Sequence, residues 1–513
     1  MAPSISTPGP MNLVVLIGVV VLSAVVFCCF ILIRNLYFHP LSKFPGPKIA
    51  AVSNLWYAYV MHRGVAPIEM SKLHKRYGPV IRVAPDELSF SSAVAFKEIY
   101  GHQKAGRPEL VKDKKYHKFV PEPILINADR EYHGTLRKLL SHGFSESALR
   151  AQEAVIQEHV SLLMQRLREH GHEGQVAVDV LRWYNVLQLQ GFGDALHWPH
   201  VYPPIKLAYG QSFGCLASSS IHPYVEFMFH FIKLASTMQV MQRLPAIMKY
   251  PYAMWTVPKD VKANVAEMKV LGNAKVNYRM ENPPPIPDFM AKLIEAHREG
   301  KMTFNQLVGN SDILLGAGSE TTATALSGLT FLLMTHPHVL NKLTRELREE
   351  FSSAEEITAV GVNKCKYLLG VIEEGLRIYP PSPATHPRYT PSGGITIDDN
   401  FVPGNMAVGV TILAACVDEA NFVDGDKFIP ERWTGEDSRF AGDKKQGSQP
   451  FSYGPRNCAG RNLAYLELKL IIANLVWHFD LENCHEGDWM DQKIYMVWQK
   501  GPLMVKLKPV KRS

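Results

Sequence analysis

Apolar residues recur at intervals of three and four along most of this chain, and that spacing predicts a protein that is mainly α-helical. The clearest helices are expected at 147–170, at 305–334 and, with a charged outer face, at 340–351. Short β-rich runs broken by Gly and Pro predict strands at 80–83, 88–90, 396–397, 406–410 and 504–507. We therefore expect an α+β fold, mainly α with small β-sheets.

Residues 186–206 do not fit this pattern, because they mix Gly, Pro and His with no clear period. A surface loop is the simplest interpretation of such a segment. It could also be an insertion, or a translated intron that a cDNA sequence would reveal.

The N-terminal pattern is different again, with an apolar stretch at 11–33 that holds no charged residue. Its 23 residues would form a helix of roughly 35 Å, enough to cross a hydrocarbon core of about 30 Å. A cleaved signal peptide would need a positively charged start and a shorter apolar core, and a buried core helix is rarely uncharged for so long. We therefore predict a transmembrane anchor.

The charges around this stretch predict its topology, because the first of them, Arg34 and Lys43, follow it and none precedes it. The positive-inside rule then makes residues 1–10 a short lumenal tail and leaves the C-terminal body in the cytosol. Three prolines predict a stiff, extended hinge over 34–48. No linker or repeat divides 49–513, which we expect to be one domain.

Charge and cysteine content limit the classes of function. The net charge of +7 is modest and no dense basic run occurs, which argues against nucleic acid and suits membrane lipid or an acidic partner. The seven cysteines are odd in number and show no paired spacing. Six of them are expected to be reduced and mostly buried, as is usual in the cytosol.

The remaining cysteine, Cys458, lies in the run FSYGPRNCAG. A thiolate that ligates haem iron needs a fixed loop, N–H groups near its sulfur and a cation for the haem propionates. Gly454 permits a tight turn, and Gly460 lets the chain approach a flat macrocycle. Arg456 is placed to reach a propionate, and Phe451 can pack over the loop. An apolar helix expected just after the run would favour a thiolate through its dipole.

The run AGSETT at 317–322 lies inside the long apolar helix. A glycine there costs up to about 1 kcal/mol relative to alanine, so the missing side chain of Gly318 should make room for a ligand. Ala317 and Thr321 share one face, where Thr321 could donate a hydrogen bond and Glu320 could carry protons from solvent. Taken alone, the run is better interpreted as a packing notch of small residues whose threonine is bonded to a backbone carbonyl.

Three charged residues are predicted to form a buried structural network. Glu374 and Arg377 lie three positions apart on an apolar helix, and Arg432 follows in Pro-Glu-Arg-Trp. Buried charges must be paired, and losing one partner costs about 3–5 kcal/mol. In a basic helical stretch, His133 and Arg137 share a face that could grip a propionate, although a solvated basic face is the alternative.

Together these motifs resemble, in kind and in order, those of the cytochrome P-450 superfamily. The resemblance covers 37–513, and the pieces at 37–41 (YFHPL) and 141–145 (SHGFS) look like fungal microsomal members such as trichothecene hydroxylases. It implies a triangular helical body that buries haem b, with Cys458 as the axial thiolate ligand of the iron. It also places Arg388 at the propionates, and Ala317 beside Gly318 along the haem.

The family resemblance implies a monooxygenase that hydroxylates or otherwise oxidises a lipophilic terpenoid or polyketide of fungal secondary metabolism. Thr321 and Glu320 would be the catalytic pair. The chain has no flavin or nicotinamide fingerprint, so electrons from NADPH would come through NADPH–cytochrome reductase, with cytochrome b5 as a further partner. The protein would be a single-pass protein of the endoplasmic reticulum membrane. Apolar pocket residues are expected at Ile313, Leu314, Ala317 and Val497, with neighbours in 112–120, 383–386 and 496–498.

Three alternative functions are compatible with part or all of these motifs. A haem-thiolate isomerase or dehydratase would need no external electrons, and a haem-binding protein without turnover would need no proton-delivery pair. The presence of Thr321 and Glu320 argues against both. A detoxifying oxygenase that acts on xenobiotics would share every motif, so only its substrates distinguish it.

Overall fold

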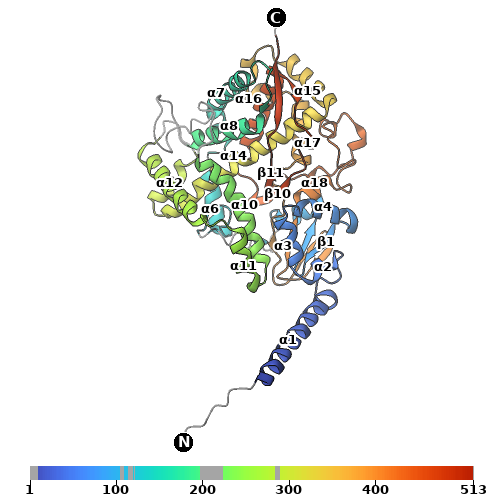
Figure 1. Cartoon of the computed structure of the whole chain (residues 1–513). Helices are drawn as coiled ribbons and strands as arrows, with labels where there is room; N and C mark the ends of the chain where they lie inside the picture. The colour runs from blue at the N-terminus through green and yellow to red at the C-terminus, as the bar shows by residue number, and fades with distance from the viewer. Residues whose placement is uncertain are drawn as a thin grey trace.

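The computed structural model describes residues 10–103, 109–113, 120, 122–141, 143–196, 223–283 and 289–511. It confirms the expected class, because a large helical body carries only small sheets. Helix α1 (Pro10–Ile33) projects from this body at the end away from the C-terminus (Figure 1). Among the described residues, Leu13–Phe38 is the one stretch long and apolar enough to cross a membrane.

The centre of the body is helix α14 (Phe304–Thr335), which the sequence predicted to within a residue at each end. Its N-terminus is closed by a capping box in which Thr303 and Gln306 satisfy each other's backbone N–H groups. It packs against α8 (Val180–Leu196), α17 (Lys366–Ile378) and α20 (Arg461–His478). These helices hold most of the largest hydrophobic cluster, so the site residues that they carry stand on a rigid core.

The remaining α-helices are α2 (Lys48–Val52), α3 (Leu55–His62), α4 (Ala66–Tyr77), α5 (Ala93–Tyr100), α6 (Arg130–Ser141), α7 (Glu146–His170), α10 (Pro223–Arg243), α11 (Ala246–Thr256), α12 (Val261–Glu281), α13 (Ala291–Arg298), α15 (Pro337–Glu350), α16 (Ala359–Val362), α18 (Ile412–Val417) and α19 (Glu431–Thr434). Helix α15 begins three residues before its predicted start, because a proline opens it at the first turn, where no N–H is needed.

Within the part of the chain that the structure describes, the strands form four small sheets. The largest has the order β1 (Val80–Ala84), β2 (Glu87–Phe90), β8 (Ala407–Val410), β5 (Arg388–Tyr389), β3 (Val111–Lys112). A three-stranded sheet has the order β4 (Val178–Asp179), β12 (Met504–Pro509), β9 (Phe479–Asn483). Two hairpins, β6 (Ile395–Ile397) with β7 (Asn400–Val402) and β10 (Lys493–Tyr495) with β11 (Val497–Gln499), complete the set. All five predicted strands are present.

The prediction of a surface loop at 186–206 is wrong for the first half of this segment. Residues up to 196 belong to α8, and Val186 and Leu187 are buried in the main hydrophobic cluster. The contacts between α8 and α14 therefore override the weak helix propensity of the glycines in this stretch. Residues 197–206 lie outside the described residues.

The hinge also differs from the extended link that its prolines predict. Arg34–Phe38 form a π-helix that continues α1, and a turn follows it. Asn35 is buried, and its Nδ2 donates to the carbonyl oxygen of Val52 at 3.1 Å. Arg82 Nη1 donates to the carbonyl oxygen of Asn35 at 2.8 Å. The base of the anchor is thus bonded to the body rather than joined to it by a free spacer.

Candidate active site

The loop that carries Cys458 is fixed by its backbone. The N–H of Cys458 donates to the carbonyl oxygen of Phe451 at 2.9 Å, and α20 begins three residues later. Gly454 has φ +75°, and a Cβ there would lie 2.0 Å from the carbonyl oxygen of Tyr100. This turn therefore requires glycine. The Phe451 ring packs against Tyr465 of α20, with centroids 5.1 Å apart.

Cys458 is exposed as a whole residue, yet the protein around its thiol is dense. Burial raises the pKa of this thiol, and the Gly460 N–H, Arg137 and Arg461 only partly oppose that effect. The expected stabilisation of the thiolate by the helix terminus is thus outweighed by desolvation. A coordinated metal ion reverses this balance, because a coordinating thiol is deprotonated.

Basic side chains gather beside this loop. His133 and Arg137 of α6 lie near Arg388 of β5 and Arg456 of the loop, as their effects on the His133 pKa show. Arg137 donates to the Oδ1 of Asn457 at 3.0 Å and to its backbone oxygen at 3.2 Å. The structure therefore brings together the four residues expected at the propionates.

The charge in this group is unbalanced. Burial first and then the neighbouring cations lower the pKa of His133 to about 3, and they also lower that of Lys112 to about 7. Burial lowers the pKa of Arg388 to about 10. Among the described residues, Glu109 is the carboxylate that bonds this group, at 2.8 Å from Arg456 Nε. An additional anion is therefore favoured here, and the two propionates of a haem fit that need.

Lys112 and Glu109 were not predicted as part of this group. Both lie outside any motif, and no spacing in the sequence relates them to Cys458. Lys112 reaches the group because β3 pairs with β5, which places it opposite Arg388 in the register. Only the tertiary pairing of these strands identifies it.

In the run 317–322 of α14, the threonine makes the bond to a backbone carbonyl that the packing-notch interpretation predicts. Thr321 Oγ1 donates to the carbonyl oxygen of Ala317 at 2.6 Å. Ala317 is nevertheless exposed although Leu314 and Leu315 beside it are buried. An exposed residue in mid-helix, like the exposed Cys458, fits a bound group that covers it.

Glu320 has a partner that the sequence did not suggest. Lys500, just beyond β11, forms an ion pair with its carboxylate, and both side chains are almost fully buried. Lys500 Nζ also donates to Thr324 Oγ1 at 2.7 Å. The expected proton carrier is therefore held by the C-terminal segment.

The charged network expected below the loop is present as a set of contacts. Glu374 accepts hydrogen bonds from Arg377 Nη2 at 2.7 Å and from Arg432 Nε at 2.9 Å, and all three side chains are fully buried. Trp433 Nε1 and the N–H of Ile429 add two further bonds at 2.8 Å. This carboxylate thus ties α17 to the segment around α19 that precedes the cysteine loop.

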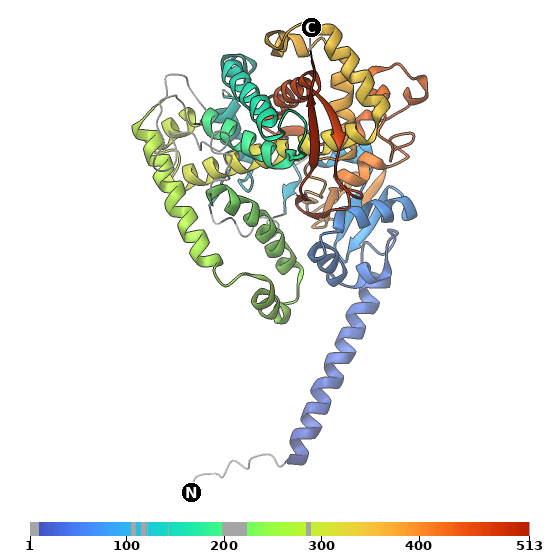
Figure 2. The same ribbon diagram turned by 45° about the horizontal axis from the view of Figure 1, so that its top comes forward.

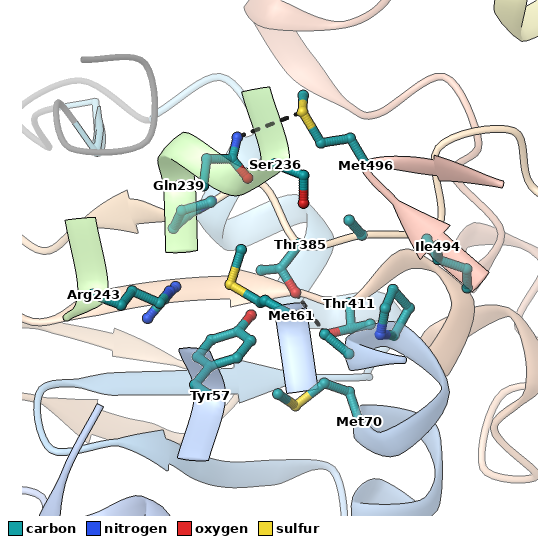
Figure 3. A pocket seen from close by; sticks show the side chains of 14 residues that line it. Tyr57, Met61, Met70, Ser236, Gln239, Arg243, Thr385, Thr411, Ile494 and Met496 are labelled. Atoms are coloured by element: carbon teal, nitrogen blue, oxygen red, sulfur yellow. Dashed lines mark hydrogen bonds between the residues drawn. The ribbon is translucent and has the colours of Figure 1, made fainter. Parts of the chain in front are cut away.

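Of the residues expected at the substrate, Leu314 is buried and Ile313 and Val497 are half-buried. None of these three lines the pocket that opens between α3, α4, α10 and the β10–β11 hairpin (Figure 3). Ala384 and Thr385, from the expected region 383–386, and Met496 at the tip of the β10–β11 hairpin contribute to its wall. In the region 112–120, residues 114–119 lie outside the described residues.

Glu467 of α20 should make stability depend on pH. Burial raises its pKa to about 8, although Thr322 donates to it, and its Oε2 has no partner among the described residues. Because the folded pKa exceeds the ordinary 4.5, folding binds a proton, and stability should fall as pH rises from about 4.5 to about 8. We expect Glu467→Gln to remove this loss, on the order of a few kcal/mol.

The measurement is urea unfolding at pH 5 and pH 8.5. The stability difference between the two should shrink in Glu467→Gln and persist in Glu267→Gln, which alters an exposed residue of α12. An unchanged difference in Glu467→Gln would show that this carboxyl does not titrate on unfolding.

Comparison with known proteins agrees with this site. The cytochrome P-450 family profile matches residues 45–507. Relatives include the cytochrome P-450 monooxygenase hepD of Aspergillus oryzae, 43% identical over 93% of this chain and 92% of its own. The monooxygenase aclL of the same fungus is 39% identical over 96% and 98%. The trichothecene C-15 hydroxylase of Fusarium sporotrichioides is 37% identical over 93% and 95%. The chain belongs to the cytochrome P-450 family and is an oxidoreductase, a monooxygenase with a haem-thiolate cofactor whose electrons come from a partner protein.

Proposed function

We propose that this monooxygenase oxidises a lipophilic terpenoid or polyketide intermediate of fungal secondary metabolism, with electrons from NADPH delivered by NADPH–cytochrome reductase and, in part, by cytochrome b5. The observation that carries the proposal is the unbalanced cationic group beside the Cys458 loop, joined to it through the bonds from Arg137 to Asn457. The similarity to a trichothecene hydroxylase supports the class of substrate.

Each site residue has a role in this proposal. Bound haem supplies the chemistry that activates dioxygen and oxidises an unactivated C–H bond. Cys458 would ligate the iron, while His133, Arg137, Arg388 and Arg456 would hold the propionates. Ala317 and Gly318 would leave room for the haem face, and Gly460 would allow its close approach.

The protons would be held by Thr321 at Oγ1 and by Glu320 at its carboxylate. Because the Thr321 hydroxyl now donates to the Ala317 carbonyl, it must rotate before it can donate elsewhere. Because Lys500 holds Glu320, this carboxylate is fixed close to Thr324 rather than free in solvent. Proton delivery would therefore require a rearrangement of both groups.

The direct test combines the purified full chain, reductase and NADPH with candidate terpenoids and polyketides. We expect substrate-dependent oxygen uptake and a product heavier by one oxygen atom in mass spectrometry. Oxygen uptake that shows no dependence on NADPH with any candidate would contradict the proposal. Conversion of a candidate without NADPH would instead favour an isomerase or dehydratase.

Thr321→Val tests the proton role. We expect product formation to fall by roughly 10²-fold, a usual contribution of one positioned proton donor, with substrate affinity unchanged. Thr344→Val is the matched control, because this residue of α15 makes the same bond to the carbonyl oxygen four residues before it, at 2.7 Å. Equal turnover in both variants would mean that Thr321 has no role in proton delivery and only makes its bond to the Ala317 carbonyl oxygen.

For localisation, we propose a single-pass protein of the endoplasmic reticulum membrane whose body also touches the bilayer. Helix α11 lies at the same end of the body as α1 in both views (Figures 1 and 2). Its Ile247, Tyr250 and Trp255 are 86%, 73% and 74% exposed, far more than is usual for such large apolar side chains. Bilayer contact would cover them.

Fluorescence quenching can test this contact in the full chain reconstituted in nanodiscs. A label on Tyr250→Cys, with Cys28 and Cys29 replaced by serine, should be quenched by lipids that carry a quencher near the headgroup. A label on Val360→Cys is the control, because this apolar residue is 72% exposed on α16, at the far end of the body. Equal quenching at the two positions would contradict the proposed contact of α11 with the bilayer.

A further inference from the structure

Four side chains form a continuous line of hydrogen bonds that ends at the pocket. His74 Nδ1 lies 2.9 Å from the carbonyl oxygen of Gly78, and its Nε2 lies 2.9 Å from Ser89 Oγ. Ser89 Oγ is 3.0 Å from Thr411 Oγ1, which is 2.7 Å from Thr385 Oγ1. All four residues are buried, and Thr385, at 8% exposed, lines the pocket together with Thr411 (Figure 3).

The direction of these bonds follows from their first member. A carbonyl oxygen can only accept, so His74 must carry its proton on Nδ1. Burial lowers the pKa of His74 to about 4, so at neutral pH the ring holds no second proton and Nε2 can only accept. Ser89 must therefore donate to His74.

The same logic passes along the line, because each hydroxyl has one proton. Because the Ser89 hydroxyl donates its proton to His74, Thr411 must donate to Ser89. The Thr411 proton is then in use as well, so Thr385 must donate to Thr411. Thr385 Oγ1 can therefore only accept a further hydrogen bond through its lone pairs. No described residue donates to it.

We propose that Thr385 is a specificity-determining residue that acts as a fixed hydrogen-bond acceptor, and that it selects substrates that present a hydroxyl or N–H group at this wall. Within the proposed function, on which this inference rests, the preferred substrate is an already hydroxylated terpenoid or polyketide rather than a bare hydrocarbon or a ketone. The reaction that supplies the substrate would then be an oxygenation, or a reduction that leaves an alcohol.

Calorimetric titration of the purified holoenzyme, without NADPH or reductase, tests this selection. Cyclohexanol, cyclohexyl methyl ether and cyclohexanone share one ring and differ in whether they can donate. We expect wild-type protein to bind the alcohol about three- to tenfold more tightly than the ether and the ketone, the effect of one hydrogen bond. Thr385→Val should abolish this preference, and Thr385→Ser should retain it.

Thr411→Val separates the direction of the bonds from their mere presence. It removes the acceptor that occupies the Thr385 proton, so Thr385 could then donate to a ligand. We expect the preference for cyclohexanol over cyclohexanone to fall towards one in this variant. Ser236→Ala, which changes another hydroxyl of the same pocket wall, should leave the wild-type preference in place.

Equal affinities in wild-type protein, or no measurable binding of cyclohexanol up to its solubility limit, would overturn the proposal. An unchanged preference in Thr385→Val would do so as well. Because these titrations need no electron transfer, the selection can hold in a chain that fails to turn over. If the enzyme turned over a substrate without a donor group and bound it as tightly as the matching alcohol, the proposed selection would be wrong. The proposed monooxygenase function would stand.

Discussion

Cys458→Ser is expected to abolish the red-shifted Soret band of the reduced carbonyl complex, and NADPH-dependent product formation with it. The variant should still fold, because the bond that fixes this loop runs from the backbone N–H of Cys458 to the Phe451 carbonyl oxygen. A serine hydroxyl is not deprotonated as readily as a thiol, so it cannot supply the electron donation that a thiolate gives to the iron.

Absorption spectra of the reduced, carbon monoxide-treated protein provide the measurement. Cys484→Ser is the matched control, because this cysteine is half-buried in a different part of the chain and should leave the band unchanged. A normal band in Cys458→Ser would show that the ligand lies elsewhere.

Glu374→Gln should have the second large effect, a loss of about 3–5 kcal/mol in the free energy of unfolding. Glu374 accepts five hydrogen bonds, two of them from Arg377 and one from Arg432, and none of the three side chains is exposed. Replacing the carboxylate leaves two buried guanidinium groups with less opposite charge. Since whole domains are stable by only about 5–15 kcal/mol, the expected result is protein that does not retain haem.

Urea unfolding and the haem content of the purified protein measure this effect. Glu295→Gln is the control, because its ion pair with Lys292 at 2.7 Å is exposed and solvent-screened, so its loss should leave the free energy of unfolding nearly unchanged. If Glu374→Gln cost no more than this control, the network would not be what holds the segment before the cysteine loop in place.

Motifs and periodicity predicted those parts of the protein that local chemistry determines. Helix α14 has a strong apolar pattern, so its limits could be predicted to within a residue at each end. Glu374 and Arg377 could be paired because they lie on one helix face, and an apolar setting demands a partner. The cysteine loop could be recognised from its ten-residue run, in which Gly454 stands at the turn that requires glycine.

What could not be predicted depends on contacts between distant parts of the chain. Lys112 joins the cationic group through the pairing of β3 with β5, and Lys500 reaches Glu320 from 180 residues away. The start of 186–206 is helical because α14 offers it a surface, which its own composition does not reveal. The proton on Thr385 is likewise set by His74, which is remote in sequence.

Lys500 has a consequence for redesign of the enzyme. It follows directly on the β10–β11 hairpin, whose Met496 forms part of the pocket wall. Hairpins of this kind are attractive units to exchange between relatives when a new substrate range is wanted. Here such a graft would also replace or shift the ammonium group that holds Glu320. Under the proton role proposed for Glu320, a chimera would acquire a new pocket and lose efficient oxygen use at once, unless position 500 is kept as lysine.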